Sequence, residues 1–287
     1  MWNVKLCMNA GGLGKPVDES VSMLAAAGFE GFFVGWKPGD NLGAVRAAAE
    51  REHMMFQSVH APFTRVNLLW QASAGTDPAV REVLDEQLRC LCETAEAGVG
   101  IMVTHTFIGF RDHTPTPFGV ENYRVLLDAA EKLGMRVALE NTEGEEYLDA
   151  LMSSLGDHPA LGFCWDSGHE MCYNRGRDLL GDYGRHIVCT HLNDNLGVHD
   201  FGGEITYLDD LHLLPFDGIA DWRYNMSRLV STGFDGPLTF ELNRGSKRGR
   251  FDNERYARLT PEEYVARAYA AACRVGVAWL QEKRSMG

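Results

Sequence analysis

Eight short apolar segments alternate with helical patterns along this chain, and this alternation constrains the fold more than any other feature. Each segment is five or six residues long and reads as a buried strand. The predicted strands are residues 4–8, 31–36, 55–60, 101–105, 136–140, 161–166, 187–191 and 238–242. The predicted helices are residues 17–27, 42–51, 78–97, 118–133, 145–155, a short segment after 166, 219–232 and 261–283. Strands that alternate with helices in this way predict a parallel sheet.

The number of strands favours one closed barrel over an open sheet. No linker-like tract of Pro, Gly and Ser separates the segments, so residues 1–287 are expected to form a single domain. Eight strand and helix pairs predict a (β/α)8 TIM barrel with eight parallel strands, and an open doubly wound sheet is the alternative. In such barrels the chemistry lies at the carboxyl ends of the strands.

Six of the predicted strands end on a histidine or a carboxylate. These residues are His60, His105, Glu140, Asp166, His191 and Glu241, and His169, Asp210 and His212 follow close behind strand ends. Imidazoles mixed with carboxylates are ligands that Zn²⁺, Mn²⁺ and Fe²⁺ prefer, and the absence of thiolates among them argues against a structural zinc. Because several unpaired charges at one barrel mouth would be unfavourable without a cation, the pattern predicts a metal site.

The overall charge argues against nucleic acid as the main partner. The chain has 27 Lys plus Arg against 40 Asp plus Glu, a net charge of −13 that would repel polyanions. Its seven cysteines are scattered without a C-x-x-C pair, as in a reduced protein. Neither a signal-peptide pattern nor an apolar run of roughly 18 residues is present, so we expect a cytoplasmic protein without a membrane partner.

Several motifs resemble those of one known superfamily. They are His60-Ala-Pro-Phe, Glu140-Asn-Thr-Glu-Gly, Asp166-Ser-Gly-His169, His191-Leu-Asn-Asp194 and Asp210-Leu-His212. Together they resemble the xylose-isomerase-like barrels, which include sugar isomerases and epimerases as well as repair enzymes of the endonuclease IV type (AP endonuclease family 2). The resemblance runs from Ser58 to Glu241, and it identifies the superfamily rather than a reaction.

The resemblance implies roles for the polar residues at the strand ends. Glu140, Asp166, His191 and Glu241 match the ligands of one divalent ion, for which Mn²⁺ is favoured and Mg²⁺, Co²⁺ or Zn²⁺ are alternatives. Glu140 and Glu241 are the expected base and acid, and His169 is expected to contact the substrate. In the endonuclease branch, residues matching His60, His105, His169, Asp210 and His212 complete a cluster of three zinc ions. In this chain His60, His105, Asp210 and His212 are therefore expected to bind either a second metal ion or the substrate.

Other residues bear on what the site recognises. Residues 244–258 contain six Lys or Arg against two acidic residues. This suits contact with a phosphate or a nucleic-acid backbone, or alternatively a solvated or subunit-contacting loop. An arginine that usually follows the His191 motif is replaced by Gly197, so substrate recognition is expected to differ from that of a free-ketose epimerase. We expect Trp36, Phe107 and Asn193 to contribute to substrate binding.

The predicted function is a divalent-metal-dependent isomerase or epimerase of a sugar or keto-sugar. It would abstract a proton next to a carbonyl and pass through an enediolate. The first alternative is a lyase that cleaves 3-keto-glycosides by β-elimination, with a small accessory subunit. The second is a phosphodiesterase for abasic DNA sites, and a non-catalytic binding module is the remaining class. The expected partners are a small carbohydrate and further copies of this chain in a homo-oligomer.

Overall fold

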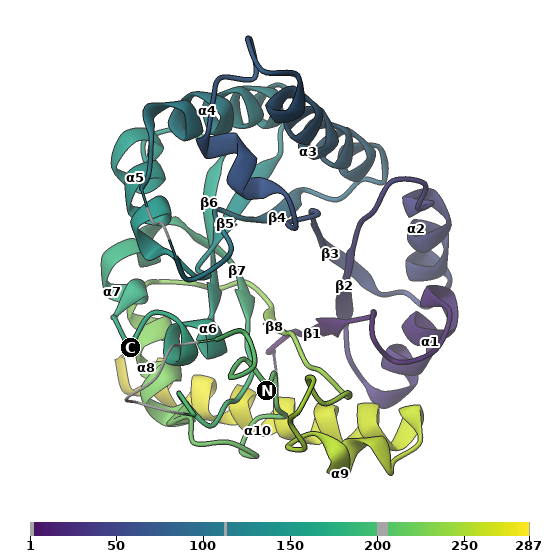
Figure 1. Ribbon diagram of the computed structural model, residues 1–287. Helices are drawn as coiled ribbons and strands as arrows, with labels where there is room; N and C mark the ends of the chain where they lie inside the picture. Colours follow the sequence, from purple (N-terminus) through teal and green to yellow (C-terminus); the bar gives the residue numbers. More distant parts are fainter. Residues whose placement is uncertain (1–2, 112–113, 200–205, 287) are drawn as a thin grey trace.

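Eight parallel strands form a nearly closed ring that is surrounded by helices in the computed structural model (Figure 1). The structure describes residues 3–111, 114–199 and 206–286. The strands are β1 (Leu6–Asn9), β2 (Gly31–Gly35), β3 (Met55–His60), β4 (Ile101–His105), β5 (Arg136–Glu140), β6 (Leu161–Asp166), β7 (Ile187–His191) and β8 (Leu238–Phe240). Each strand from β1 to β6 pairs with the next, and β8 pairs with β1. The predicted (β/α)8 barrel is confirmed.

The join between β7 and β8 closes the ring by fewer contacts than the others. Leu192 and Phe240 form one parallel bridge, and the Leu192 amide donates to the Thr239 carbonyl oxygen at 2.8 Å. The Thr190 hydroxyl lies in the same gap and accepts a hydrogen bond from the Thr239 amide at 3.0 Å. The Thr190 side chain therefore satisfies a backbone N–H of β8 that has no backbone partner on β7.

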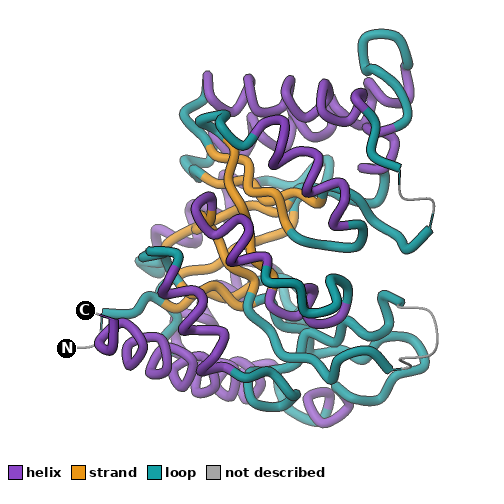
Figure 2. Tube along the Cα trace, turned by 90° about the vertical axis from the view of Figure 1, so that its left-hand side faces the viewer, coloured by secondary structure: helices purple, strands orange, loops and turns teal. Residues whose placement is uncertain are grey.

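The helices lie outside the ring, as the side view shows (Figure 2). They are α1 (Val17–Ala27), α2 (Leu42–Arg51), α3 (Pro78–Glu96), α4 (Pro117–Lys132), α5 (Glu145–Leu155), α6 (Ser167–Cys172), α7 (Leu179–Tyr183), α8 (Trp222–Ser231), α9 (Glu254–Ala257) and α10 (Pro261–Met286), with 3-10 turns η1 (Val66–Trp70) and η2 (Gly184–His186). Among the described residues, no helix combines the length and apolar composition needed to cross a membrane.

Most element bounds agree with the sequence prediction, and local capping explains where they differ. Asp77 caps α3 by accepting from the amides of Ala79 and Val80, as its position before a proline predicts. The helix expected at 219–232 begins instead at Trp222, because the Asp221 side chain accepts from the Tyr224 amide and fixes the helix start. The last strand ends at Phe240, so Glu241 follows it directly.

A buried ion pair ties α8 to α6, the short helix that follows β6. Arg228 donates to both carboxylate oxygens of Glu170, at 2.6 and 2.9 Å, and its guanidinium lies 5.6 Å from the Trp165 ring centroid. Glu170 also accepts from the Trp165 indole at 3.0 Å and from the Leu179 amide at 3.2 Å. Since Glu170 is buried, its charge depends on these donors.

Replacing Arg228 with Met should destabilise the fold by about 3 kcal/mol, because it leaves the Glu170 carboxylate buried without its cation. Urea unfolding followed by circular dichroism measures this change. Arg46→Met is the matched control, since Arg46 and Glu50 form an exposed pair on α2 whose loss should change stability by less than about 1 kcal/mol. Equal effects of the two substitutions would contradict this reading of the buried pair.

Candidate metal centre and substrate cavity

The polar strand ends meet because each lies on the inner face of its strand. Alternate residues of a strand point to the same side, so the residue two positions earlier also faces the barrel interior. These earlier residues are small or medium in size, as in the interior cluster of Val103, Ala138, Cys164 and Cys189. Each strand from β4 to β7 therefore places one such residue below and one potential ligand above, at the mouth of the barrel.

Four of the predicted ligands come together at this mouth. Glu140, Asp166, His191 and Glu241 each offer one atom, and these atoms lie within 4.8 Å of one another. The His191 Nδ1 atom lies 2.9 Å from Glu140 Oε1 and 3.1 Å from Glu241 Oε2. Bonds of about 2.0–2.2 Å from oxygen and nitrogen to a divalent ion are compatible with such spacing.

The remaining predicted residues surround this group. His60 and His105 lie 3.0 and 3.3 Å from Glu140 Oε2 through their Nε2 atoms. His169 and His212 lie on the other side, where they form a second possible ligand group with Asp166. All of the catalytic and metal-binding residues predicted from the sequence are thus placed in one cluster.

Three histidines of this cluster use one ring nitrogen on the backbone. The Nδ1 atoms of His60, His169 and His212 lie 2.8–2.9 Å from the carbonyl oxygens of Ala61, Asn141 and Glu241. A carbonyl oxygen can only accept a hydrogen bond, so Nδ1 must carry the proton. In the neutral ring Nε2 is then unprotonated and acts as an acceptor. Each Nε2 nevertheless faces a carboxylate. This arrangement suits either a doubly protonated ring or a cation near the two groups. The donor set of Glu140, Asp166, His191 and Glu241 is the observation that fits a divalent ion.

Mutual pairing sets the charges of the cluster. Burial alone would lower the pKa of His191, but the negative charges of Glu140 and Glu241 outweigh it and raise that pKa well above its ordinary value. Burial alone would raise the pKa of Glu140, but the charge of His191 and hydrogen bonds from neighbouring imidazoles hold it well below its usual range. At Asp166 burial prevails over the charge of His169 and, with the negative charges of Glu140 and Glu241, raises the pKa to about 6. Asp166 is therefore the least compensated of these three carboxylates.

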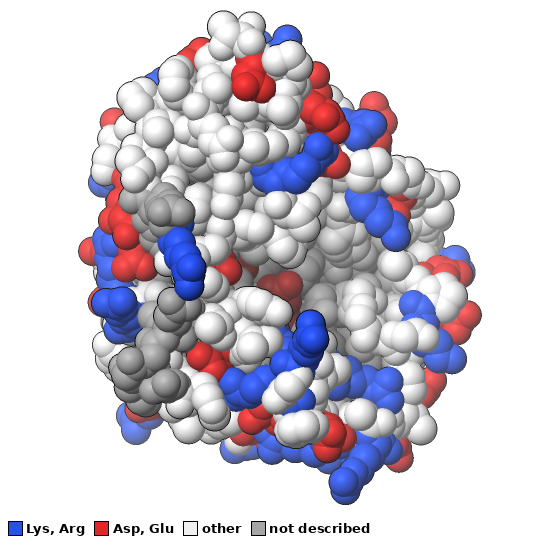
Figure 3. Space-filling view, viewed as in Figure 1, with Lys and Arg blue, Asp and Glu red and all other residues white. Residues whose placement is uncertain are grey.

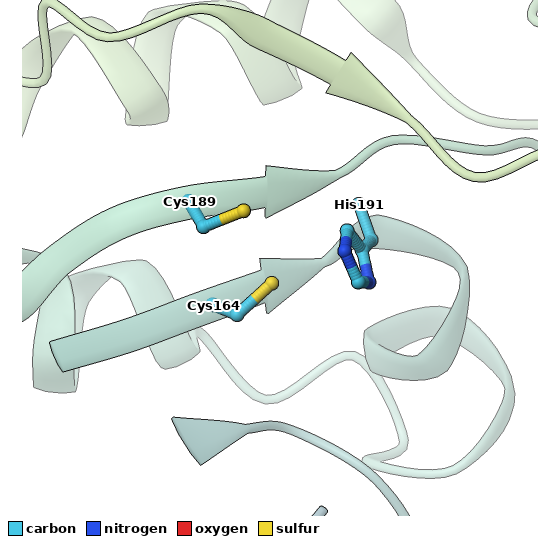
Figure 4. Close-up of side chains that lie close together, drawn as sticks. All are labelled: Cys164, Cys189 and His191. Atoms are coloured by element: carbon cyan, nitrogen blue, oxygen red, sulfur yellow. The ribbon is translucent and has the colours of Figure 1, made fainter. Parts of the chain in front are cut away.

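Two thiols lie in the layer below His191. The sulfur atoms of Cys164 and Cys189, on the neighbouring strands β6 and β7, point toward the imidazole (Figure 4). Together with a ring nitrogen of His191 they form a group whose atoms lie within 4.8 Å of one another. Gln57 donates to the Cys189 sulfur at 3.1 Å. The strand-end pattern did not include these thiols, although the period of two places each of them two residues before a predicted ligand.

A cavity of about 790 Å³ opens above the cluster, and Figure 3 shows the hollow with acidic atoms inside it. Its polar lining comes from the cluster, including His60, His105, His169, His212 and Glu241. Its lining also contains several aromatic residues, which are Phe33, Trp36, Phe63, Phe110, Tyr173 and Tyr207. Glu140 and Asp166 are fully buried beneath this surface.

The three predicted substrate contacts are placed differently from one another. Trp36 lines the cavity. The Phe107 ring stacks on Tyr147 with centroids 4.0 Å apart, outside the residues that line the cavity. Asn193 is buried and donates to both carboxylate oxygens of Asp166, at 3.1 and 3.0 Å. It therefore orients a predicted ligand. Phe110 and Tyr173 provide aromatic surface that sequence reasoning did not identify, because loop residues carry no period.

The basic segment 244–258 pairs with a neighbouring loop. Lys247 contacts Asp210 at 2.8 Å, and Arg250 contacts Asp209 at 2.7 Å. Lys and Arg side chains gather on this side of the hollow in the space-filling view (Figure 3). Lys247 lines the cavity, and at least these two cations of the segment already have carboxylate partners.

The chain belongs to the xylose isomerase-like TIM barrel family, whose model matches residues 21–269. The uncharacterized protein y4fM of Sinorhizobium fredii (strain NBRC 101917 / NGR234) is 26% identical to it over 308 residues, which cover 90% of this chain and 88% of that protein. The family and the resemblance inferred from the motifs agree.

Solved structures share the fold at low sequence identity. The IOLI protein with a bound zinc atom has a TM-score of 0.73 and 20% identity, covering 96% of this chain and 99% of that one. The 3-keto-D-glucoside 4-epimerase YcjR of E. coli has a TM-score of 0.65 and 16% identity, covering 95% and 100%. A fusion of a xylose isomerase-like barrel with 4-hydroxyphenylpyruvate dioxygenase has a TM-score of 0.69 and 20% identity, and the 89% of this chain that aligns with it spans 41% of its length.

Replacing Glu140 with Gln should lower the affinity for Mn²⁺ or Zn²⁺ by at least about 100-fold, because it removes a charged oxygen ligand from the centre of the cluster. Equilibrium dialysis with metal analysis measures the affinity. Affinity should also fall as the pH is lowered through about 6, since a proton then competes for Asp166. Glu143→Gln is the control, because Glu143 lines the cavity outside the ligand group. Unchanged affinity in Glu140→Gln would place the ion elsewhere.

Proposed function

We propose that this protein is a divalent-metal-dependent isomerase or epimerase of a sugar or keto-sugar that transfers a proton next to a carbonyl. The observation that carries the proposal is the position of Glu241. This carboxylate belongs to the four-residue ligand group and also lines the cavity, so it can reach both an ion and a substrate. The family and the sugar epimerase among the structural relatives support the same class.

Different residues of the site would bind the ion, transfer the proton and orient the substrate. A divalent ion held by Glu140, Asp166, His191 and Glu241 would supply positive charge for the oxygens of an enediolate. Glu241 is our choice for the general base because it faces the cavity. Glu140 is then the candidate for the general acid. His169 faces the cavity with its Nε2 atom and would orient a substrate hydroxyl. Its Nδ1 proton is fixed on the Asn141 carbonyl at 2.9 Å, which sets the ring orientation.

The cavity supports a related second candidate, a reaction on a glycoside. A volume of about 790 Å³ lies in the upper part of the range of about 300–1,000 Å³ that suits drug-sized ligands. A free monosaccharide would fill only part of it. The polar floor and the aromatic wall suit a sugar that carries a planar apolar group. On such a substrate the same proton abstraction would give epimerisation, or β-elimination if a leaving group lies β to the carbanion.

The phosphodiesterase alternative has less support. Lys247 and Arg250 of the basic segment are engaged with carboxylates of the chain itself. The net charge of −13 also opposes the approach of DNA. We therefore place hydrolysis at abasic sites behind both carbohydrate reactions.

In deuterated water the protein should incorporate deuterium at the carbon next to the carbonyl of its substrate. A panel of ketoses and 3-keto-glycosides, followed by mass spectrometry and proton NMR, measures the exchange. Glu241→Gln should slow it by about 10²- to 10⁴-fold, which is the usual contribution of a positioned base. Glu143→Gln should retain it. No exchange on any member of the panel by the metal-loaded protein would count against proton abstraction.

If the substrate is a glycoside with an aromatic aglycone, Phe63→Ala should raise its KM by about 3- to 10-fold. Phe63 is 40% exposed at the wall, and its ring stacks on His105 with centroids 4.3 Å apart. Removing an aromatic contact loses about 0.5–1.5 kcal/mol beyond the buried area. Phe118→Ala is the control, because Phe118 is equally exposed but lies outside the residues that line the cavity. A KM that changes equally for a free keto-sugar would contradict the role of the aglycone.

A further inference from the structure

Lys247 reaches from the basic segment into the cavity and ends on a buried carboxylate. Its Nζ atom donates to Asp210 Oδ2 and to the Tyr207 carbonyl oxygen, each at 2.8 Å. The side chain lines the cavity and is mostly buried. An ammonium group has three N–H donors, so these contacts use two of them and leave one for another partner.

Asp210 is the centre of a second polar group in the cavity. Its Oδ2 atom lies 2.8 Å from His212 Nε2 and 3.6 Å from His169 Nε2. Its other oxygen, Oδ1, is buried and has no hydrogen-bond partner among the described residues. Both histidines donate Nδ1–H to backbone carbonyls and so turn Nε2 toward Asp210. Two imidazole nitrogens and a carboxylate oxygen are a donor set that binds transition-metal ions.

The lysine and such an ion would compete for the same oxygen. A metal bound to Asp210 Oδ2 would lie within a few ångströms of the Lys247 ammonium, where two positive charges repel each other strongly in a buried site. The ammonium already neutralises Asp210 and has an additional acceptor in the Tyr207 carbonyl. The contacts therefore favour the lysine over an added ion.

We propose that Lys247 is the permanent cation of the group formed by Asp210, His169 and His212, so that this group binds substrate rather than a second metal ion. This inference rests on the proposed function and deepens it. The free N–H donor of Lys247, which lines the cavity, would donate to a hydroxyl or carbonyl oxygen of the carbohydrate. The group that could have extended the metal site thus becomes part of substrate recognition.

The test is the number of Zn²⁺ ions retained after dialysis against micromolar Zn²⁺, measured by plasma mass spectrometry. Lys247→Met removes the charge and keeps an unbranched chain, and it should retain one more ion per chain than the native protein. Lys247→Ala should also retain one more ion per chain. It serves as a second variant because its smaller side chain cannot block a site that a methionine side chain could fill. The gain should disappear when Asp210→Asn is added to either variant. Circular dichroism confirms that each variant is folded.

Two control variants distinguish the loss of the Lys247 charge from other changes in the same segment. Arg250→Met removes another ion pair of the same segment, with Asp209, and should retain the native number of ions. Lys247→Arg keeps the charge and should also do so. The proposal is overturned if neither Lys247→Met nor Lys247→Ala gains an ion, or if Asp210→Asn alone removes an ion from the native protein. A native protein without any bound ion would overturn the proposed function, while the difference between native and Lys247 variants would still test the lysine.

Discussion

The burial of Glu140 is the constraint on which the rest of this barrel mouth depends. The side chain is fully buried, and a carboxylate in that position is stable only when cations or strong donors compensate its charge. Imidazoles from β3, β4 and β7 contact its two oxygens. Two of these imidazoles have further partners, because His60 contacts the Ala61 carbonyl and His191 contacts Glu241. The buried Glu140 charge therefore explains why three imidazoles gather around one carboxylate at the barrel mouth.

The loops that follow β7 and β8 form the other half of the site, and they depend on each other. Asn253 donates to the carbonyls of Leu211 and Asn243, at 3.0 and 2.7 Å. The Tyr256 hydroxyl donates to Asp217 at 2.6 Å and accepts from the Leu214 amide at 3.1 Å. With the ion pairs of Lys247 and Arg250, these contacts join two irregular segments into one wall. The same segments also place Leu211, Leu213, Leu214 and Tyr256 in the main hydrophobic core.

The sequence predicted the barrel and the ligand cluster closely because both depend on short periods. The alternation of strand and helix predicted bounds that match the structure within one residue at β3 to β7. The polar strand ends predicted six candidate ligands, and the resemblance to the superfamily selected the four that converge. The wall of the cavity could not be predicted in this way. Phe110, Tyr173 and Tyr207 lie in loops or at a helix end, where side-chain direction follows from tertiary contacts.

Asn193 was expected to contact substrate, but its position two residues after His191 turns it toward Asp166. The pairing of Lys247 with Asp210 joins residues 37 positions apart, and charge counting alone suggested an open basic patch.

The division between strand ends and loops has a consequence for how such a protein can change. A one-residue insertion within a strand would turn its ligand from the inside of the barrel to the outside, because successive side chains point in opposite directions. The ligand cluster is therefore intolerant of length variation. Insertions and substitutions in residues 244–252 leave the strand register untouched and alter the shape and charge of the loop that carries Lys247. New substrate preferences in this barrel should thus arise through its loops, both in natural divergence and in directed evolution.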